Sequence, residues 1–193
     1  SEQTRVGLLQ ATRLLEKSER LPAFAALARL AASQTSSPLV AVHLIDTHSV
    51  QMLAGVGNLP KRQSREGALS AQALRQEGPW QIRDVQQQAS ASRATAEAVP
   101  AAYAGHPLIV EGHTLGVLCV MDTEVRQWDD AQMAGLADVA CAVSALLLGE
   151  LHQQRARRME ARVRTANLAG NDWMWETDSD NRLAWVSSSM VQH

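Results

Sequence analysis

The stretch that decides the fold is "AGHPLIVEGHTLGVLCVMD", residues 104–122. It holds two apolar runs, 106–110 and 115–121, with Glu111, Gly112 and His113 between them. Two apolar runs joined by a short turn that contains glycine are typical of a β-hairpin. We therefore expect two adjacent antiparallel strands here, and we work outward from them.

Further strands are predicted upstream of the hairpin. The segment "PLVAVHLID" (38–46) is rich in Val, Leu and Ile and predicts a strand, with "SVQMLAGVG" (49–57) as its partner across Thr47 and His48. "LSAQAL" (69–74) predicts a short helix, and "WQIRDV" (80–85) predicts another strand. Residues 86–102 form either a loop with a helical turn or a lid, since long loops in compact domains are often functional.

Helical spacing appears at both ends of this region. Residues 6–17 and 21–34 each have it, and a much longer helix is expected from Asp129 to about Ala166. Asp129 and Asp130 suit the N-terminal cap and the positive end of the helix dipole. In the basic second half, Met159, Val163 and Ala166 keep a 4,3 spacing. This spacing fits a weak dimer seam or a solvated helix with a short apolar stripe.

The last segment, "NDWMWETDSDNRLAWVSSS" (171–189), alternates again. Trp173 and Trp175 would share one face of a strand, and residues 178–181 supply turn residues before a second strand. A lone hairpin is marginal in water. We therefore expect a second domain that this chain only begins, and we interpret the chain as a piece of a longer protein.

The composition excludes several classes of partner. Of the 193 residues, 46% are hydrophobic and 20% charged, and the net charge is −2. Such a charge gives no field that would favour nucleic acid or an anionic membrane. No apolar run is long enough to predict membrane insertion, and no signal peptide is visible. Cys119 and Cys141 lie in apolar sequence and are expected to be reduced core thiols of a cytoplasmic protein.

Three stretches resemble the GAF family of small-molecule sensor domains. "PLVAVHLID" is similar to the family's first strand, "REGALSAQAL" (65–74) to its short helix, and "YAGHPLIVEGHTLGVLCVMD" (103–122) to its closing hairpin. The resemblance implies an α+β fold with a central antiparallel sheet flanked by helices and a long C-terminal exit helix. The expected domains are an N-terminal helix (1–19), the sensor domain (20–150), a signalling helix (151–167) and the start of a PAS-like domain (168–193), which the tail resembles.

The resemblance also implies a ligand pocket between one sheet face and the short helix with its lid. Ser70 and Gln72 stand where many family members have Cys and His, so no covalent bilin or strong metal ligand is expected there. Trp80, Asp84 and Tyr103 flank the lid by the family order. His106 lies near the pocket mouth, where it could donate to a ligand or tie a strand end. The alternative for Trp80 and Tyr103 is ordinary core packing.

No motif in the sequence predicts a catalytic or a metal-binding site. The six histidines show no HxH or HExxH spacing, and no glycine-rich phosphate loop or nucleophile elbow occurs. Some GAF proteins reduce free methionine sulfoxide with three cysteines, but this chain has two. Cyclic-nucleotide binding needs a motif with a Phe that is missing here. We therefore expect no catalytic residues, no metal, no cofactor and no enzyme in this chain.

These observations predict a non-catalytic sensory module of a bacterial signal-transduction protein. It would bind an unidentified small molecule and relay the signal through its exit helix to a cyclic-di-GMP enzyme or a histidine kinase. The alternative is a dimerisation or linker domain without a ligand. In either case a homodimer through the helices is expected, with no nucleic acid partner.

Overall fold

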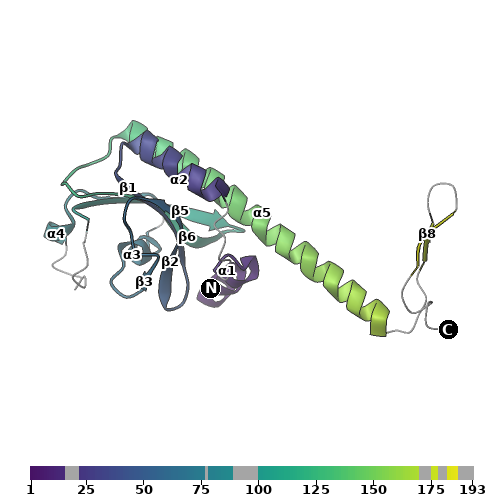
Figure 1. Ribbon diagram of the computed structural model, residues 1–193. Helices are drawn as coiled ribbons and strands as arrows, with labels where there is room; N and C mark the ends of the chain where they lie inside the picture. The colour runs from purple at the N-terminus through teal and green to yellow at the C-terminus, as the bar shows by residue number, and fades with distance from the viewer. Residues whose placement is uncertain (16–21, 77, 89–99, 170–174, 178–181, 187–193) are drawn as a thin grey trace. The chain divides into compact units, whose positions relative to one another are not determined.

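The computed structural model describes residues 1–15, 22–76, 78–88, 100–169, 175–177 and 182–186. The chain divides into two compact units, Ser1–Leu151 (unit 1) and His152–His193 (unit 2), and the division falls inside the longest helix. Figure 1 shows the elements, which in chain order are α1 (Glu2–Thr12), α2 (Pro22–Thr35), β1 (Leu39–Ile45), β2 (Ser49–Val56), β3 (Arg62–Ser64), α3 (Leu69–Ala73), β4 (Trp80–Ile82), α4 (Val85–Gln88), β5 (Ala102–Val110), β6 (His113–Asp122), α5 (Asp130–Ala169), β7 (Trp175–Thr177) and β8 (Leu183–Val186).

Unit 1 is built on one antiparallel sheet with the strand order β3-β2-β1-β6-β5-β4. The strands expected near residues 40, 82, 107 and 118 all join this sheet, which confirms the predicted α+β fold. Strand β3 was not expected, because its three residues lie in a polar stretch without an apolar pattern. Helix α4 begins one residue before the segment interpreted as a loop or lid; residues 89–99 of that segment lie outside the described residues.

The hairpin predicted at residues 104–122 forms, with its turn at Glu111 and Gly112. Strands β5 and β6 meet at Glu111 and Gly112, whose φ angles are +48° and +75°. Positive φ at both central residues matches the twist of antiparallel strands. The pairing register shifts between Leu108 and Ile109, and the Ile109 amide donates to Oγ of Ser144 on α5 at 3.1 Å. The hairpin is thereby tied to the long helix.

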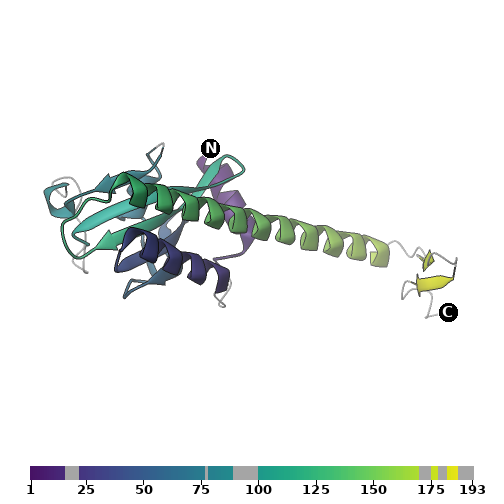
Figure 2. The ribbon, with the colours of Figure 1, turned by 90° about the horizontal axis from the view of Figure 1, so that it is seen from above.

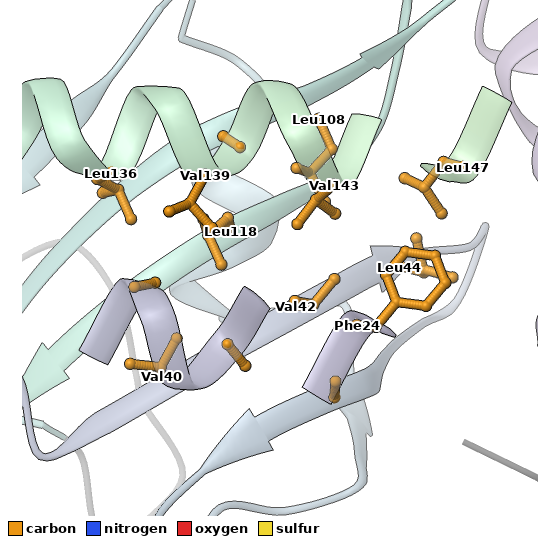
Figure 3. Close-up of a cluster of buried hydrophobic side chains, with 14 of the residues drawn as sticks. Phe24, Val40, Val42, Leu44, Leu108, Leu118, Leu136, Val139, Val143 and Leu147 are labelled. Atoms are coloured by element: carbon orange, nitrogen blue, oxygen red, sulfur yellow. The ribbon is translucent and has the colours of Figure 1, made fainter. Parts of the chain in front are cut away.

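Helices α2 and α5 lie side by side over one face of the sheet, which we call the helix face (Figures 1 and 2). Alternate residues of each strand point toward these helices, as the two-residue period of a strand requires. The interface is a packed apolar core, and Figure 3 shows Leu136, Val139, Val143 and Leu147 of α5 and Phe24 of α2 facing Val40, Val42, Leu44 and Leu118 of the sheet.

Short helix α3 covers part of the opposite face, which we call the α3 face (Figure 1). The intervening strand residues point this way. They form a second apolar cluster with residues of α3 and its flanks, and its buried members are Ala41, Ile45, Val50, Ala68, Ile82, Val85, Tyr103, Val117, Cys119 and Met121. The sheet therefore separates two cores that are carried by the same strands.

The C-terminus of α2 is fastened to the end of β6. Arg126 donates to the carbonyl oxygens of Ser36 and Thr35 at 2.9 and 3.1 Å, and it pairs with Asp122 at 3.0 Å. Its guanidinium also lies 5.0 Å from the ring centre of Trp128. A cation at the last carbonyls of a helix is favoured by the helix dipole. Arg126, which precedes α5 in the chain, thereby holds the C-terminus of α2 against the end of β6.

Both ends of helix α1 differ from those expected, whereas helix α5 begins where expected. Helix α1 was expected at 6–17 but begins after Ser1, whose hydroxyl caps the amide of Thr4, and it ends at Arg13 with φ +56°. The pattern could not show this end, because a left-handed Arg carries no sequence signal. Helix α5 begins as expected: Asp129 Oδ1 accepts from the Gln132 amide at 2.8 Å, and Gln132 Oε1 accepts from the Asp129 amide at 3.1 Å.

By length and composition alone, helix α5 could cross a membrane, with a mean hydropathy of 1.7 in its most apolar window. The core helix of a globular protein passes the same test, and 28% of that window is buried in the structure. In unit 2, β7 pairs antiparallel with β8. Trp173 and the turn expected at residues 178–181 lie outside the described residues.

Candidate functional site

A cluster of polar side chains is buried within the apolar layer of the α3 face. It consists of His43 on β1, Ser70 on α3, Tyr103 on β5 and Cys119 on β6. Each of the four is at most 5% exposed. Because a buried polar group is costly unless it finds a partner, such a cluster in an otherwise apolar layer is an informative feature.

The strand register brings the sheet residues of this cluster together. Cys119 lies directly across from Ala41 on one side and from Gly105 on the other. His43 stands two residues after Ala41 on β1, and Tyr103 stands two residues before Gly105 on β5. Because side chains alternate along a strand, both share the face of Cys119. A side chain at Gly105 would collide with Tyr103, since a Cβ there would lie 2.8 Å from the tyrosine hydroxyl. Glycine leaves room for the Tyr103 ring over the strand.

Ser70 is the centre of the hydrogen bonds. Its Oγ lies 2.7 Å from Nδ1 of His43 and accepts from the Tyr103 hydroxyl at 3.4 Å. Sγ of Cys119 lies 3.8 Å from Ser70 Oγ and 3.5 Å from His43 Nδ1, and it donates to the Ala41 carbonyl at 3.4 Å. Ser70 therefore fastens α3 to three strands of the sheet.

All four groups are uncharged at neutral pH. Burial lowers the pKa of His43 to about 4 and raises the pKa of Cys119 to about 12. Burial also raises the pKa of Tyr103 well above its usual value. For His43, the cause of the shift is the loss of hydration of the charged imidazolium on burial.

A β-bulge lies beside His43. The register between β1 and β2 shifts between Val42 and His43, so that Val42 faces Ala54 while His43 faces Met52. Bulges are common next to functional sites, where they redirect side chains. Nδ1 of His43 makes both contacts of the ring, and no described group bonds to Nε2.

Three of the six ligand-binding residues expected from the sequence lie on the α3 face near one another. Ser70 and Tyr103 are both part of the cluster. Trp80 is half-buried, and its ring centre lies 5.6 Å from that of Tyr103, with the ring planes at 55°. Their positions are consistent with the expected pocket, although ordinary packing would also place the two aromatic rings in contact.

The other three expected residues are not brought to the cluster by any described contact. Gln72 is half-buried on α3, without a described side-chain hydrogen bond. Oδ1 of Asp84 accepts from the Gln86 and Gln87 amides at 3.0 and 3.2 Å and so caps α4. His106 lies across from Leu118 and therefore on the helix face, with Nδ1 3.1 Å from the Pro107 carbonyl oxygen. The grouping of His106 with Tyr103 is wrong, because residues three apart on a strand point to opposite faces.

His43 and Cys119 belong to the cluster but were not among the expected ligand-binding residues. His43 lies between Val42 and Leu44, which pack in the helix-face core, so the alternation of a strand places His43 on the α3 face. The register between β1, β6 and β5 brings Cys119 and Tyr103 to this face, and the packing of α3 brings Ser70 to His43. The expectation that both cysteines are core residues is half wrong, since Cys141 is exposed on α5.

The chemistry open to this cluster is hydrogen bonding rather than nucleophilic attack. A thiol nucleophile needs a depressed pKa, and that of Cys119 is strongly raised. Within the described parts of the chain, no three His, Cys, Asp or Glu side chains form a group that could hold a metal ion.

A family model and the similar solved structures both identify the same domain. A family model described as "GAF domain" matches residues 13–147. No match was found among the curated proteins. Similar solved structures include a GAF domain from an Acinetobacter phosphoenolpyruvate-protein phosphotransferase, at 13% identity and a TM-score of 0.58, covering 79% of this chain and 95% of that one.

Two further structures show how varied these similar folds are. The free methionine-R-sulfoxide reductase of Neisseria meningitidis, solved with its substrate, is 19% identical with a TM-score of 0.55, and the match covers 78% of this chain and 89% of that one. The blue-light absorbing form of the PixJ GAF domain from Thermosynechococcus elongatus is 17% identical with a TM-score of 0.52, and the match covers 79% and 94%. At these identities the structures establish the fold alone.

Proposed function

The chain belongs to the GAF domain family, and from that premise we propose that unit 1 is a sensory module that binds a small molecule at the α3 face. The observation that carries the proposal is the buried cluster of His43, Ser70, Tyr103 and Cys119, whose polar groups converge within an apolar layer. Ligand sites are mostly apolar, with a few polar groups that converge, and the α3 face has this composition. The role is regulatory, because none of the four groups is activated for chemistry.

The sheet offers a direct route from this site to α5. His43 lies between Val42 and Leu44, and Cys119 lies between Leu118 and Val120, all four of which pack in the helix-face core. A ligand that displaces β1 or β6 therefore also moves the surface against which α5 packs. Such a ligand shifts the signalling state only if it binds two arrangements of the helix with different affinity.

We extend this proposal to the protein from which the chain comes. It would be a cytoplasmic bacterial signalling protein in which α5 leads to a PAS-like domain and then to a cyclic-di-GMP enzyme or histidine kinase. The support is the resemblance of residues 171–189 to the opening of a PAS domain and the antiparallel pair β7–β8. The sequence of the full-length protein tests this extension, which fails if no such domains follow.

A metabolite screen by thermal denaturation tests the binding role. We expect at least one small molecule to raise Tm of the wild type, and we expect Ser70→Ala to abolish this increase. Ser49→Ala is the matched control, because Ser49 is also a buried serine but has no described contact with the cluster. If every metabolite leaves Tm unchanged, or if both variants respond as the wild type does, the binding role is contradicted.

A second candidate function, dimerisation, is favoured by the exposed face of α5 in unit 2. His152, Ala156, Met159 and Val163 follow a 4,3 spacing, and the last two are 61% and 51% exposed. With Ala156 and Val163 at a positions, Arg155 takes a g position and Glu160 the following e position. A parallel second copy would then pair each Arg155 with the other chain's Glu160.

A charge-swap series tests this dimer. Sedimentation of Arg155→Glu should show weakened self-association, because two acidic residues then face each other. The double variant Arg155→Glu with Glu160→Arg should restore it, since the pair is reversed but complementary. A wild-type chain that stays monomeric at high concentration, or a double variant that is no better than the single one, contradicts the parallel pairing.

A further inference from the structure

Glu2, the first residue of α1, binds two arginines that belong to different parts of unit 1. Its carboxylate accepts from Nε and Nη2 of Arg5 at 2.9 and 2.8 Å and from Nη1 of Arg65 at 2.5 Å. The hydrogen bond from Arg5 is the main reason that the pKa of Glu2 falls to about 2, and Arg65 contributes to the same shift. Glu2 is therefore ionised at neutral pH, and its one carboxylate holds both guanidinium groups.

Both arginines also bind the end of β1 and the turn after it. Nη1 of Arg5 donates to the carbonyl oxygen of Ile45, and Nη1 of Arg65 donates to that of Asp46 at 3.1 Å. Ile45 lies two residues after His43 and packs in the core of the α3 face. The charged side chains therefore attach α1 to the strand that carries His43.

The main chain of Arg65 leads directly into α3. Its amide donates to the His48 carbonyl at 3.0 Å, and its carbonyl accepts from the Ala68 amide at 3.3 Å. Helix α3 begins at the residue after Ala68 and carries Ser70 of the buried cluster. Arg65 thus stands between the two helices, because Glu2 of α1 holds its side chain while its backbone forms the turn before α3.

Asp46 offers Arg65 a second carboxylate. Oδ1 of Asp46 is a buried oxygen that lacks a hydrogen-bond partner among the residues that the structure describes, whereas the backbone carbonyl of Asp46 already accepts from Arg65. A buried acceptor without a partner is costly, and charged donors make the stronger hydrogen bonds. Moving the Arg65 guanidinium from Glu2 to Oδ1 would exchange one ion pair for another. A switch requires two such alternative arrangements of one element.

Building on the binding role proposed above, we propose that Arg65 is a switch residue with two positions, one on Glu2 of α1 and the other on the carboxylate of Asp46, and that its position sets how firmly α3 covers the α3 face. With Arg65 on Glu2, α3 is tied to α1 and the face is covered. With Arg65 on Asp46, this tie is lost and α3 opens more often. Because coupling between sites is reciprocal, a ligand under α3 would in turn act on α1.

Amide hydrogen exchange of the whole chain without a ligand tests the switch at the α3 amides of Ala71 and Gln72, which both bond to the Ala68 carbonyl. Glu2→Gln keeps the size of the side chain but removes its charge. We expect these amides to exchange about threefold faster in this variant, the order of effect of a half-exposed ion pair. Glu66→Gln is the matched control, because Glu66 is exposed and lies outside this network. It should leave the exchange unchanged.

Asp46→Asn separates a switch from a simple tie. In the wild type Oδ1 of Asp46 has no described partner, so Asp46→Asn alone should change the exchange of α3 little. In the Glu2→Gln background Arg65 depends on Asp46, so the same substitution should accelerate exchange by about a further threefold. The nitrogen-15 resonances of the Arg65 guanidinium should move with Glu2→Gln and move again when Asp46→Asn is added.

Three outcomes would overturn the switch. They are unchanged α3 exchange in Glu2→Gln, faster exchange in β5 and β6 as well as in α3, and an effect of Asp46→Asn that is equal in both backgrounds. No ligand is used, so these outcomes leave the binding role to the metabolite screen. If that screen finds no Ser70-dependent metabolite while the exchange results hold, the link between α1 and α3 stands and its control of ligand access is contradicted.

Discussion

At the scale of single residues, His43 shows how position determines chemistry. The same imidazole on a loop would be half-charged near pH 6.5, but on β1 it faces Ser70, Cys119 and Tyr103 in an apolar layer. Cys119 and Tyr103, the titratable groups in that cluster, have raised pKa values and do not ionise in the acid range. Protonation of His43 therefore places an uncompensated charge in the core.

This environment makes stability depend on pH. The pKa of His43 falls from 6.5 in the unfolded chain to about 4 in the folded one. The unfolded chain binds the extra proton as pH falls below 6.5, so the stabilisation is complete above that pH and is lost progressively down to pH 4. The loss amounts to about 3 kcal/mol. Urea unfolding between pH 4 and 7 should show a steeper decline for the wild type than for His43→Gln, and parallel profiles would contradict this environment.

The two thiols should differ sharply in reactivity. Cys119 is fully buried with its pKa raised to about 12, whereas Cys141 is exposed on α5. Because the thiolate is the reactive species, Ellman's reagent should label Cys141 quickly in the native protein. In a Cys141→Ser variant, labelling of Cys119 should follow unfolding and become fast only in urea. Fast native labelling of that variant would show that the cluster is open to reagents.

At the scale of secondary-structure elements, the contact between β1 and β6 depends on Gly116. A Cβ at this position would collide with the backbone carbonyl of His43. We expect Gly116→Ala to destabilise unit 1 by about 2 kcal/mol, because backbone cannot move aside as a flexible side chain can. Gly7→Ala is the control, since a Cβ there meets nothing within 4 Å and alanine favours the helix. Equal midpoints of urea unfolding for wild type and Gly116→Ala would contradict the close approach.

Arg126 joins the end of β6 to the end of α2. Its loss removes two hydrogen bonds to carbonyl oxygens at the helix terminus and the ion pair with Asp122. We expect Arg126→Ala to cost about 2 kcal/mol, since hydrogen bonds from charged donors are among the stronger ones. Arg29→Ala, at an exposed position of α2, should change the midpoint of thermal unfolding little. If the two variants unfold alike, Arg126 does not hold α2.

The elements were predictable where a pattern repeated. The apolar runs of the hairpin and of the first two strands placed four strands and their turns, and Asp129 marked the start of α5. Strand β3 and the end of α1 could not be predicted. The former is three polar residues paired by backbone alone, and the latter is a left-handed arginine.

At the scale of the whole chain, unit 1 has two hydrophobic cores, one on each face of a single sheet. The helix face holds α2 and α5, and the α3 face holds the polar cluster. The resemblance to the family predicted Ser70 as a ligand-binding residue from its place in the short helix, and Tyr103 from its place beside the lid. It could not predict their meeting with His43 and Cys119, which depends on the register between three strands. The same register removed His106 from the group.

The central claim is that ligands bind at the α3 face, and methyl NMR of the wild-type chain tests it most directly. Pools of small metabolites would be added while the methyl resonances of both cores are followed. The account predicts that Ile82, Val117 and Met121 respond first and most strongly, with smaller changes at Val42 and Leu118 across the sheet. Pools that shift no methyl group on the α3 face, or that shift helix-face methyl groups alone, would contradict it.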